Sequence, residues 1–175
     1  MAGKNIKIFR ADFFNRPTLL VARELLGKFL VRKINGRIIS GRITEVEAYI
    51  GSKDKASHAL RGKTLRTEVM FGKAGHWYVY LIYGIYCCLN IVTEKEGYPA
   101  AVLVRSVDHT SGPGRVCKKF EITRGLNKKL ADKASGLWIE DRGAEARPSQ
   151  IKRGKRIGVD YAGEWKDRPW RFYLK

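Results

Sequence analysis

The sequence predicts an α+β fold in which residues 1–175 form a single domain around a curved, mostly antiparallel sheet with a protruding β-hairpin and a few helices. The chain has 175 residues, of which 44% are hydrophobic and 11% are aromatic. This composition supports one buried core and excludes a disordered or fibrous chain. Segments with strand character outnumber segments with helix character, and most of them are separated by short turns, which is typical of antiparallel pairing.

The clearest helix is predicted over residues 18–26. Pro17 can occupy a first-turn position, apolar residues recur along the segment, and Gly27 provides a C-terminal stop. A second, short helix is expected over residues 116–123. Before it, residues 111–115 (Ser-Gly-Pro-Gly-Arg) resemble a helix entry whose free backbone amides suit a phosphate.

The first hairpin is predicted from Asn35-Gly36, the strongest short turn signal in the chain, which joins strands over residues 28–34 and 37–50. Strict alternation along the second strand puts Ile43, Glu45, Glu47 and Tyr49 on one face and Thr44, Val46 and Ala48 on the other. Later strands are expected over residues 77–82, 85–92, 100–107, 137–140 and 156–160. Between and after these strands, residues 51–73 are expected to form a long polar loop and residues 161–175 an irregular aromatic, basic tail.

The charge balance points to a polyanionic partner. Lys and Arg number 35 against 17 Asp and Glu, which gives a formal net charge of +18. Folding does not require this excess, whereas binding to nucleic acid does. A generally basic, ribosome-like protein is the alternative on charge alone. An anionic membrane is a weaker candidate, because the sequence contains no basic amphipathic helix and no apolar run that could span a bilayer.

Cysteine and histidine give no sign of a metal site. The three cysteines include no C-x-x-C pair, and the three histidines do not complete any familiar ligand spacing. The adjacent Cys87 and Cys88 are expected to act as small hydrophobic residues on opposite faces of a strand. The N-terminus carries no apolar signal segment. We therefore expect no metal or cofactor, no membrane association, and a place in the cytoplasm, at the nucleoid.

Two carboxylates on one strand face are candidates for acid–base chemistry. In a partly dry, cationic site, Glu47 or Glu45 could stay ionised and take a proton from water. An ordinary exposed salt bridge explains either residue equally simply, and their spacing does not choose between them.

Tyr83 stands at the tip of the second predicted hairpin, next to Gly84, where little burial is available. An aromatic side chain there could wedge into a base stack, although it could also fold back onto its own hairpin. The neighbouring Tyr78 and Tyr80 could offer stacking surface or simply belong to the core. Among the remaining polar residues, Asn90 interrupts an apolar strand and Arg105 ends one, so each needs a hydrogen-bonding partner.

Taken together, the motifs resemble the alkyladenine (3-methyladenine) DNA glycosylases of the mammalian type over almost the whole chain. The blocks that carry the resemblance lie in order along the sequence. They are Thr44-Glu-Val-Glu-Ala-Tyr49, Asp54-Lys-Ala-Ser-His58, Met70-Phe71, Tyr78-Val-Tyr-Leu-Ile-Tyr-Gly84, Leu89-Asn90, Val104-Arg105, Gly112-Pro113 and Ala162-Gly-Glu-Trp165. The chain lacks the long N-terminal extension of the mammalian proteins, and this compact form suggests a prokaryotic source.

The resemblance implies a monofunctional hydrolase that flips a damaged purine out of duplex DNA and cleaves its N-glycosidic bond, leaving an abasic site. By motif position, Glu47 corresponds to the general base that activates water, which selects it over Glu45. Arg105 corresponds to the arginine that helps to hold that water, and Tyr83 to the residue that fills the gap left by the flipped base. Asn90 matches the side chain that excludes the 2-amino group of guanine.

Further residues follow from the same resemblance. Three aromatic side chains correspond to the walls that contact the flipped base, namely Tyr49, His58 and Tyr80. Independently of the resemblance, phosphate contacts are expected from Arg66 and, at the helix entry described above, from Gly114 and Arg115. The partner is then double-stranded DNA with a damaged purine, bound by a monomer without metal or cofactor. Two alternatives are a non-catalytic, basic nucleic-acid-binding module on the same fold and a glycosylase that acts on RNA or free nucleosides.

Overall fold

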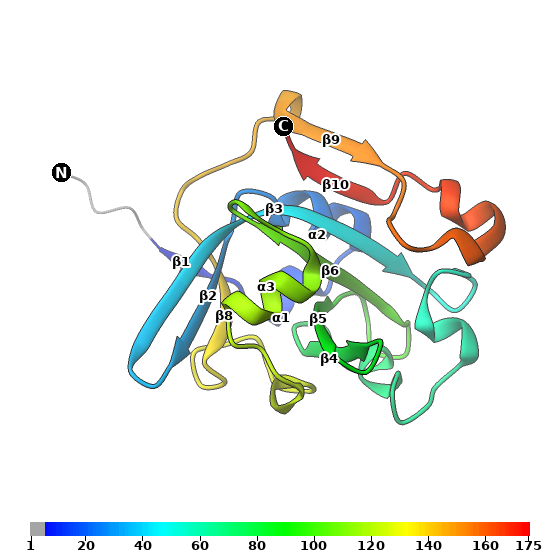
Figure 1. Ribbon diagram of the computed structural model, residues 1–175, viewed down its shortest axis with the longest axis horizontal. Helices are drawn as coiled ribbons and strands as arrows, with labels where there is room; N and C mark the ends of the chain where they lie inside the picture. The colour runs from blue at the N-terminus through cyan, green and yellow to red at the C-terminus, as the bar shows by residue number, and fades with distance from the viewer. Residues whose placement is uncertain (1–5) are drawn as a thin grey trace.

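The computed structural model describes residues 6–175 and confirms the α+β fold with an open antiparallel sheet (Figure 1). The strands are β1 (Lys7–Ile8), β2 (Phe29–Ile34), β3 (Arg37–Ile50), β4 (Trp77–Ile82), β5 (Tyr86–Val92), β6 (Ala100–Val107), β7 (Thr110–Ser111), β8 (Leu137–Asp141), β9 (Ile151–Gly154) and β10 (Arg171–Leu174). The α-helices are α1 (Ala11–Phe14), α2 (Thr18–Leu25) and α3 (Pro113–Lys119). Short 3-10 helices are η1 (His58–Arg61), η2 (Glu68–Phe71), η3 (Arg124–Leu126), η4 (Pro148–Gln150) and η5 (Asp160–Asp167).

The long strand β3 organises the sheet. The strand order is β1-β8-β2-β3-β6-β5-β4, and β10 joins the sheet by pairing with both β3 and β9. The first half of β3 pairs with β2, while its second half pairs with β6 and β10. In Figure 1 the β9–β10 pair, coloured orange to red, lies beside β3 although it comes from the end of the chain. Glu47 therefore lies on a central strand with neighbours on both sides.

A β-bulge corrects the strict alternation expected along β3. The pairing with β6 shifts register between Ile43 and Val46, so Ile43 joins Val46 and Ala48 in the hydrophobic core. One extra residue at a bulge reverses which face the following side chains occupy. Ile43 was therefore placed on the wrong face, while Glu47 and Tyr49 do lie on the face opposite to the core.

The main hydrophobic core lies between one face of the sheet and the helices α2 and α3. Val21, Ala22 and Leu25 of α2 and Val116 and Phe120 of α3 are buried there. A smaller cluster on the other face packs the segment of residues 51–73 against the strands through Ala59, Val69, Met70, Tyr78, Val92 and Ala101. The predicted long polar loop is thus packed against the sheet, and it contains η1 and η2.

Most of the predicted elements are present. Helix α2 ends one residue before the predicted position, and Gly27 follows with a φ of 86°, as a C-terminal stop requires. Strands β4 and β6 have the predicted bounds, and β5 begins one residue later. Asn35 and Gly36 both have positive φ, as a tight hairpin turn requires.

Three segments differ from their predictions. The second helix spans Pro113–Lys119 instead of residues 116–123, because Pro113 can start a helix at its first position. Residues 156–160 form no strand, since Arg156 is buried in an ion pair and the N–H of Ile157 bonds to a side chain. The predicted irregular tail contains η5 and β10, because the fully buried Phe172 ties its end to the sheet.

Candidate active site

The site is built by strand alternation on the face of the sheet opposite to the main core. Cα pairing aligns Tyr78 of β4, Asn90 of β5, Leu103 of β6 and Glu47 of β3 in one row across four strands. Their sequence neighbours, such as Val46 and Val102, point into the core. Because side chains alternate with a period of two, four buried strands deliver their polar and aromatic residues to the same place.

This row forms the floor of a cavity of about 370 Å³. Much of its walls is formed by residues 56–58, by residues 157–159 and by Tyr161, and the β4–β5 hairpin lies at its rim. Eight of the predicted residues line it, namely Glu47, Tyr49, His58, Arg66, Tyr80, Tyr83, Asn90 and Arg105. The sequence motifs, which are scattered over 59 positions from 47 to 105, are therefore brought together in space.

Glu47 is fully buried at the floor, and it accepts two hydrogen bonds. The hydroxyl of Tyr49 donates to Oε2 at 2.8 Å, and the backbone N–H of Ile157 donates to Oε1 at 2.9 Å. Burial raises the pKa of Glu47, while the Ile157 N–H, Arg105 and Tyr49 act to lower it. This carboxylate is therefore not part of an exposed salt bridge, but is desolvated and held in one orientation by two hydrogen bonds.

Arg105 forms ion pairs with both Glu45 and Glu47, but the two carboxylates differ in their other contacts. Its Nη1 lies 3.8 Å from Glu47 Oε1, and its Nε lies 3.4 Å from Glu45 Oε1. Glu45 is further occupied by Arg171 at 2.9 Å and by the hydroxyl of Ser106 at 2.6 Å, and it does not line the cavity. Glu45 is thus saturated by structural contacts, whereas Glu47 faces the open space.

His58 is half-buried in a group of aromatic side chains. Its Nδ1 shares a hydrogen bond of 2.9 Å with the hydroxyl of Tyr78, and its ring meets the edge of Tyr80 at a centroid distance of 4.5 Å. Burial, Arg66 and Arg61 lower the pKa of His58 to about 4. The imidazole is therefore neutral at pH 7, which suits contact with an aromatic base and not with a phosphate.

Asn90 of β5 is buried, and a hydrogen bond from its side-chain amide holds it in place. Its Nδ2 donates to the carbonyl oxygen of Tyr78 at 3.2 Å. That bond fixes how the amide presents itself to the cavity that it lines. A buried amide in one orientation is a rigid steric and polar feature of the floor.

Tyr83 lies at the tip of the β4–β5 hairpin and is 85% exposed, so it does not fold back onto the hairpin. Tyr83 and Gly84 have φ values of 53° and 69°, and the N–H of Ile85 donates to the carbonyl of Ile82 at 3.2 Å. This is the geometry of a type I′ turn, where Gly, Asn and Asp are preferred. A bulky aromatic residue held at positive φ and exposed to solvent favours a role in binding.

The three predicted phosphate contacts separate in the structure. Arg66 is exposed at the cavity, with its guanidinium 5.3 Å from the centre of the Tyr80 ring. Arg115 is exposed on α3 and does not line the cavity. Gly114 has a packing role, because a Cβ there would lie 3.2 Å from Cβ of Tyr86. Glycine at this position lets α3 approach the hairpin closely.

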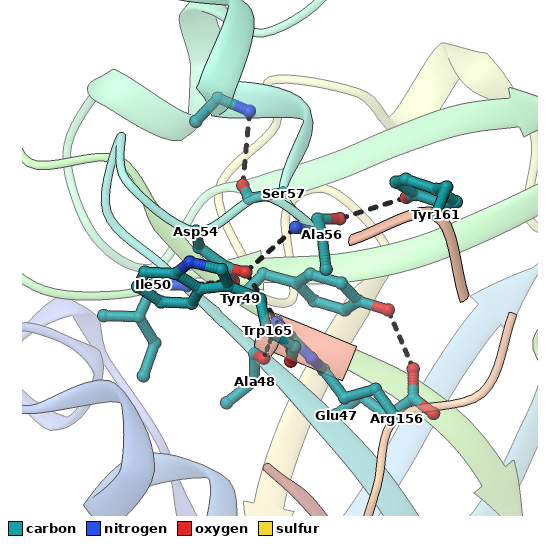
Figure 2. A network of polar contacts seen from close by, with 11 residues as sticks. Glu47, Ala48, Tyr49, Ile50, Asp54, Ala56, Ser57, Arg156, Tyr161 and Trp165 are labelled. Carbon is teal, nitrogen blue, oxygen red and sulfur yellow. Dashed lines mark hydrogen bonds and ion pairs between the residues drawn. The ribbon is translucent and has the colours of Figure 1, made fainter. Parts of the chain in front are cut away.

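Sequence reasoning missed the ion pair that joins the two walls. Asp54 and Arg156 are both fully buried and make a bidentate pair at 2.6 and 2.8 Å (Figure 2). Arg156 also donates to the carbonyl oxygens of Ala48 and Trp165, at 3.0 and 3.2 Å. Asp54 begins the motif Asp54-Lys-Ala-Ser-His58, but its position there indicates no role, and among 35 cationic residues nothing in the sequence distinguishes Arg156.

Within residues 6–175, no group of three or more His, Cys, Asp or Glu side chains is placed to hold a metal ion. Nor does that part of the chain contain a helix with the length and apolar character needed to cross a membrane. Cys88 lines the cavity while Cys87 packs against the core, so the two cysteines do lie on opposite faces.

Comparison with known proteins gives one consistent result. The family model for methylpurine-DNA glycosylase matches residues 12–110 and 106–175. A protein of Methanocella arvoryzae named "Putative 3-methyladenine DNA glycosylase" is 50% identical, covering 94% of this chain and 90% of its own. Proteins of the same name from Myxococcus xanthus and Legionella pneumophila are 49% and 47% identical, covering 94% and 93% of this chain and 88% and 92% of their own. These relatives are archaeal and bacterial, so they support the family named in the sequence analysis but not the mammalian type.

Proposed function

The chain belongs to the methylpurine-DNA glycosylase family, as a hydrolase acting on N-glycosyl bonds, and we propose on this premise that it removes alkylated or deaminated purines from double-stranded DNA. The lesion classes are 3-methyladenine, 7-methylguanine, hypoxanthine and ethenoadenine. One observation supports this proposal above the others: a fully buried carboxylate, Glu47, at the floor of an aromatic-walled cavity that opens beside an exposed hairpin tip.

The proposed reaction is hydrolysis by a single activated water. Glu47 accepts a proton from water as the water oxygen bonds to C1′ of the sugar, while the N-glycosidic bond breaks and its electron pair leaves with the base. In this proposal Arg105, whose guanidinium lies 3.8 Å from Glu47, helps to hold the same water. An anionic carboxylate also stabilises the positive charge that develops on the sugar. A methylated purine such as 3-methyladenine or 7-methylguanine carries positive charge in the nucleotide and leaves readily, so for these lesions one base and one water suffice.

The cavity walls suit a base that has left the helix. Tyr49, His58 and Tyr80 provide flat faces and edges, and neutral His58 adds no charge to the pocket. In this proposal Asn90 excludes the 2-amino group of normal guanine, because its amide is fixed by the Tyr78 carbonyl. Tyr83 fills the gap in the duplex, at the exposed end of the hairpin.

The surface charge supplies the remaining contacts. A net charge of +18 attracts the phosphate backbone without regard to sequence, as a protein that searches for lesions requires. In this proposal the exposed Arg66 and Arg115 and the backbone of Gly114, in the first turn of α3, contact phosphates. We expect the enzyme to act as a monomer, without metal or cofactor, in the nucleoid of a prokaryotic cytoplasm.

The test is single-turnover excision on matched duplexes that each carry one lesion (hypoxanthine, ethenoadenine or a methylated purine). Wild-type protein is expected to release the free base. Glu47→Gln keeps the shape of the side chain but cannot accept the proton, so its release should fall by at least about 10³-fold with lesion binding retained. Glu45→Gln is the matched control and should stay within a few-fold of wild type.

Two outcomes would contradict the proposal. Normal excision by Glu47→Gln would show that another group activates the water. Absence of release from every duplex by the wild-type protein, with tight DNA binding retained, would favour a non-catalytic binding module on this fold.

A further inference from the structure

The buried pair Asp54–Arg156 joins two parts of the chain that both contribute to the cavity. Asp54 follows β3 and lies four residues before His58, whereas Arg156 lies 102 residues further on, before η5. Both side chains are completely buried. Burying two charges carries a large desolvation cost, and a hydrophobic pair of similar volume is often as stable. A stabilising role alone therefore does not explain why this position holds an ion pair.

Asp54 organises the loop that leads to His58. Its carboxylate accepts the N–H groups of Ile50 at 3.2 Å and Ala56 at 3.0 Å, and its backbone carbonyl accepts the N–H of Ser57 at 2.9 Å. Ala56, Ser57 and His58 all line the cavity. The carboxylate thus sets the path of the wall that carries the imidazole.

Arg156 acts on the floor of the cavity. Its guanidinium lies 4.8 Å from the centre of the Tyr49 ring, and the hydroxyl of that ring donates to Glu47. The next residue, Ile157, donates its N–H to the other oxygen of the same carboxylate. Figure 2 shows the Tyr49 hydroxyl directed at the carboxylate of Glu47 and the side chain of Asp54 close to Arg156. Both hydrogen bonds that hold Glu47 therefore come from groups adjoining Arg156.

We propose that Asp54 and Arg156 are positioning residues that orient the Glu47 carboxylate and place the walls around the base, with effects on the rate of bond cleavage rather than on DNA binding. This inference rests on the proposed function, since it assigns to the pair a part in the same reaction. Neither side chain lines the cavity, so neither acts on the substrate directly.

The test separates positioning from stability by removing both charges together. Asp54→Asn alone leaves Arg156 buried and unpaired and is expected to destabilise the fold, whereas Asp54→Asn/Arg156→Gln leaves no unpaired charge. The double variant is expected to bind lesion DNA with wild-type affinity but to cleave about 10- to 100-fold more slowly. Arg156→Lys keeps the charge without the planar fork, so its cleavage rate should lie between those of the wild type and the double variant.

The pH profile provides a readout that general destabilisation does not move. The N–H of Ile157 lowers the pKa of Glu47, so a displaced Ile157 raises it, and the acidic limb of the rate profile should move to higher pH. Asp167→Asn is the matched control, because Asp167 pairs with Lys155, next to Arg156, on the exposed surface. This control should keep the wild-type rate and profile.

A double variant that folds and cleaves with the wild-type rate and pH profile would overturn the inference. Failure of the proposed function is recognised separately, because wild-type protein would then release no base. In that event the pair is judged by carbon-13 NMR titration of the Glu47 carboxyl group, assigned with Glu47→Gln. An unchanged Glu47 pKa in the double variant would contradict the positioning role, and a raised pKa would support it.

Discussion

The cavity floor and the hairpin tip contribute to one site under opposite physical conditions. At the floor, Glu47 is fully buried on a central strand with paired strands on both sides. At the tip, Ile82, Tyr83, Ile85 and Tyr86 expose between 37% and 85% of their surface. The floor gains its precision from packing and hydrogen bonds. The tip exposes apolar surface that contributes almost nothing to the stability of the free protein.

The two tight hairpin turns make the same contrast at the level of the backbone. The β2–β3 turn uses Asn35-Gly36 with φ values of 49° and 74°, and the β4–β5 turn uses Tyr83-Gly84 with 53° and 69°. Both turns hold two successive residues at positive φ, although the first loop has two residues between Ile34 and Arg37 and the second has three between Ile82 and Tyr86. Asparagine adopts positive φ far more readily than tyrosine. Tyrosine is thus the less favourable residue for this backbone conformation, which fits the binding role proposed for Tyr83.

The largest expected effect is that of salt, which should weaken DNA binding by the exposed surface but hardly change cleavage at the buried floor. Phosphate contacts release counterions, so affinity for lesion DNA is expected to fall about 10³-fold between 50 and 200 mM salt if about six phosphates are contacted. The cleavage rate within the bound complex depends on the buried floor and should hardly change. Fluorescence titrations and single-turnover assays at each salt concentration measure the two quantities. A flat binding response would contradict the electrostatic interpretation of the +18 net charge.

A change of pH should do the opposite, altering cleavage while leaving binding nearly constant. Glu47 acts as a base only when ionised, so the rate should fall about tenfold per pH unit below its pKa. Burial raises that pKa, so the fall begins at a higher pH than for an ordinary glutamate. The pKa of His58 is about 4, so His58 should add no step between pH 5 and pH 8.

The measurement is a single-turnover pH profile with a 7-methylguanine duplex, in which the leaving base is already cationic. Asp167→Asn, at an exposed acid that pairs with Lys155, serves as the control and should keep the acidic limb. A second step between pH 5 and pH 8 that disappears in His58→Gln would show that His58 titrates there and would place it in the chemistry.

The parts of this site that could be predicted are those set by strand periodicity and by local turns. Alternation placed Glu47 and Tyr49 on one face, and the Tyr83-Gly84 break placed the tip. The bulge near Thr44 could not be foreseen, because it depends on how β3 pairs with β6, 60 residues later. The partner of Asp54 was equally hidden, since Arg156 is one of 35 cationic residues and only the folded chain brings the two together.

Replacing Tyr83 by alanine tests the tip directly. Tyr83→Ala removes the side chain proposed to fill the gap in the duplex, so excision from duplex DNA should fall about 10- to 100-fold, corresponding to part of the few kcal/mol needed to unstack a base step. Excision from a single-stranded oligonucleotide with the same lesion is the internal control and should change much less. Full duplex activity in the variant would instead favour an enzyme of RNA or free nucleosides.

The smallest effect expected concerns stability, and it tests whether the tip is strained. Tyr83→Asn supplies the residue type already used in the β2–β3 turn, so urea unfolding should show a gain of about 1 kcal/mol while duplex excision falls as it does in Tyr83→Ala. Little burial is lost, because Tyr83 is 85% exposed. The reciprocal change, Asn35→Tyr, should lower stability by a similar amount without affecting excision. If Tyr83→Asn were no more stable than wild type, tyrosine at positive φ would carry no cost here, and the contrast between the two turns would have to rest on binding alone.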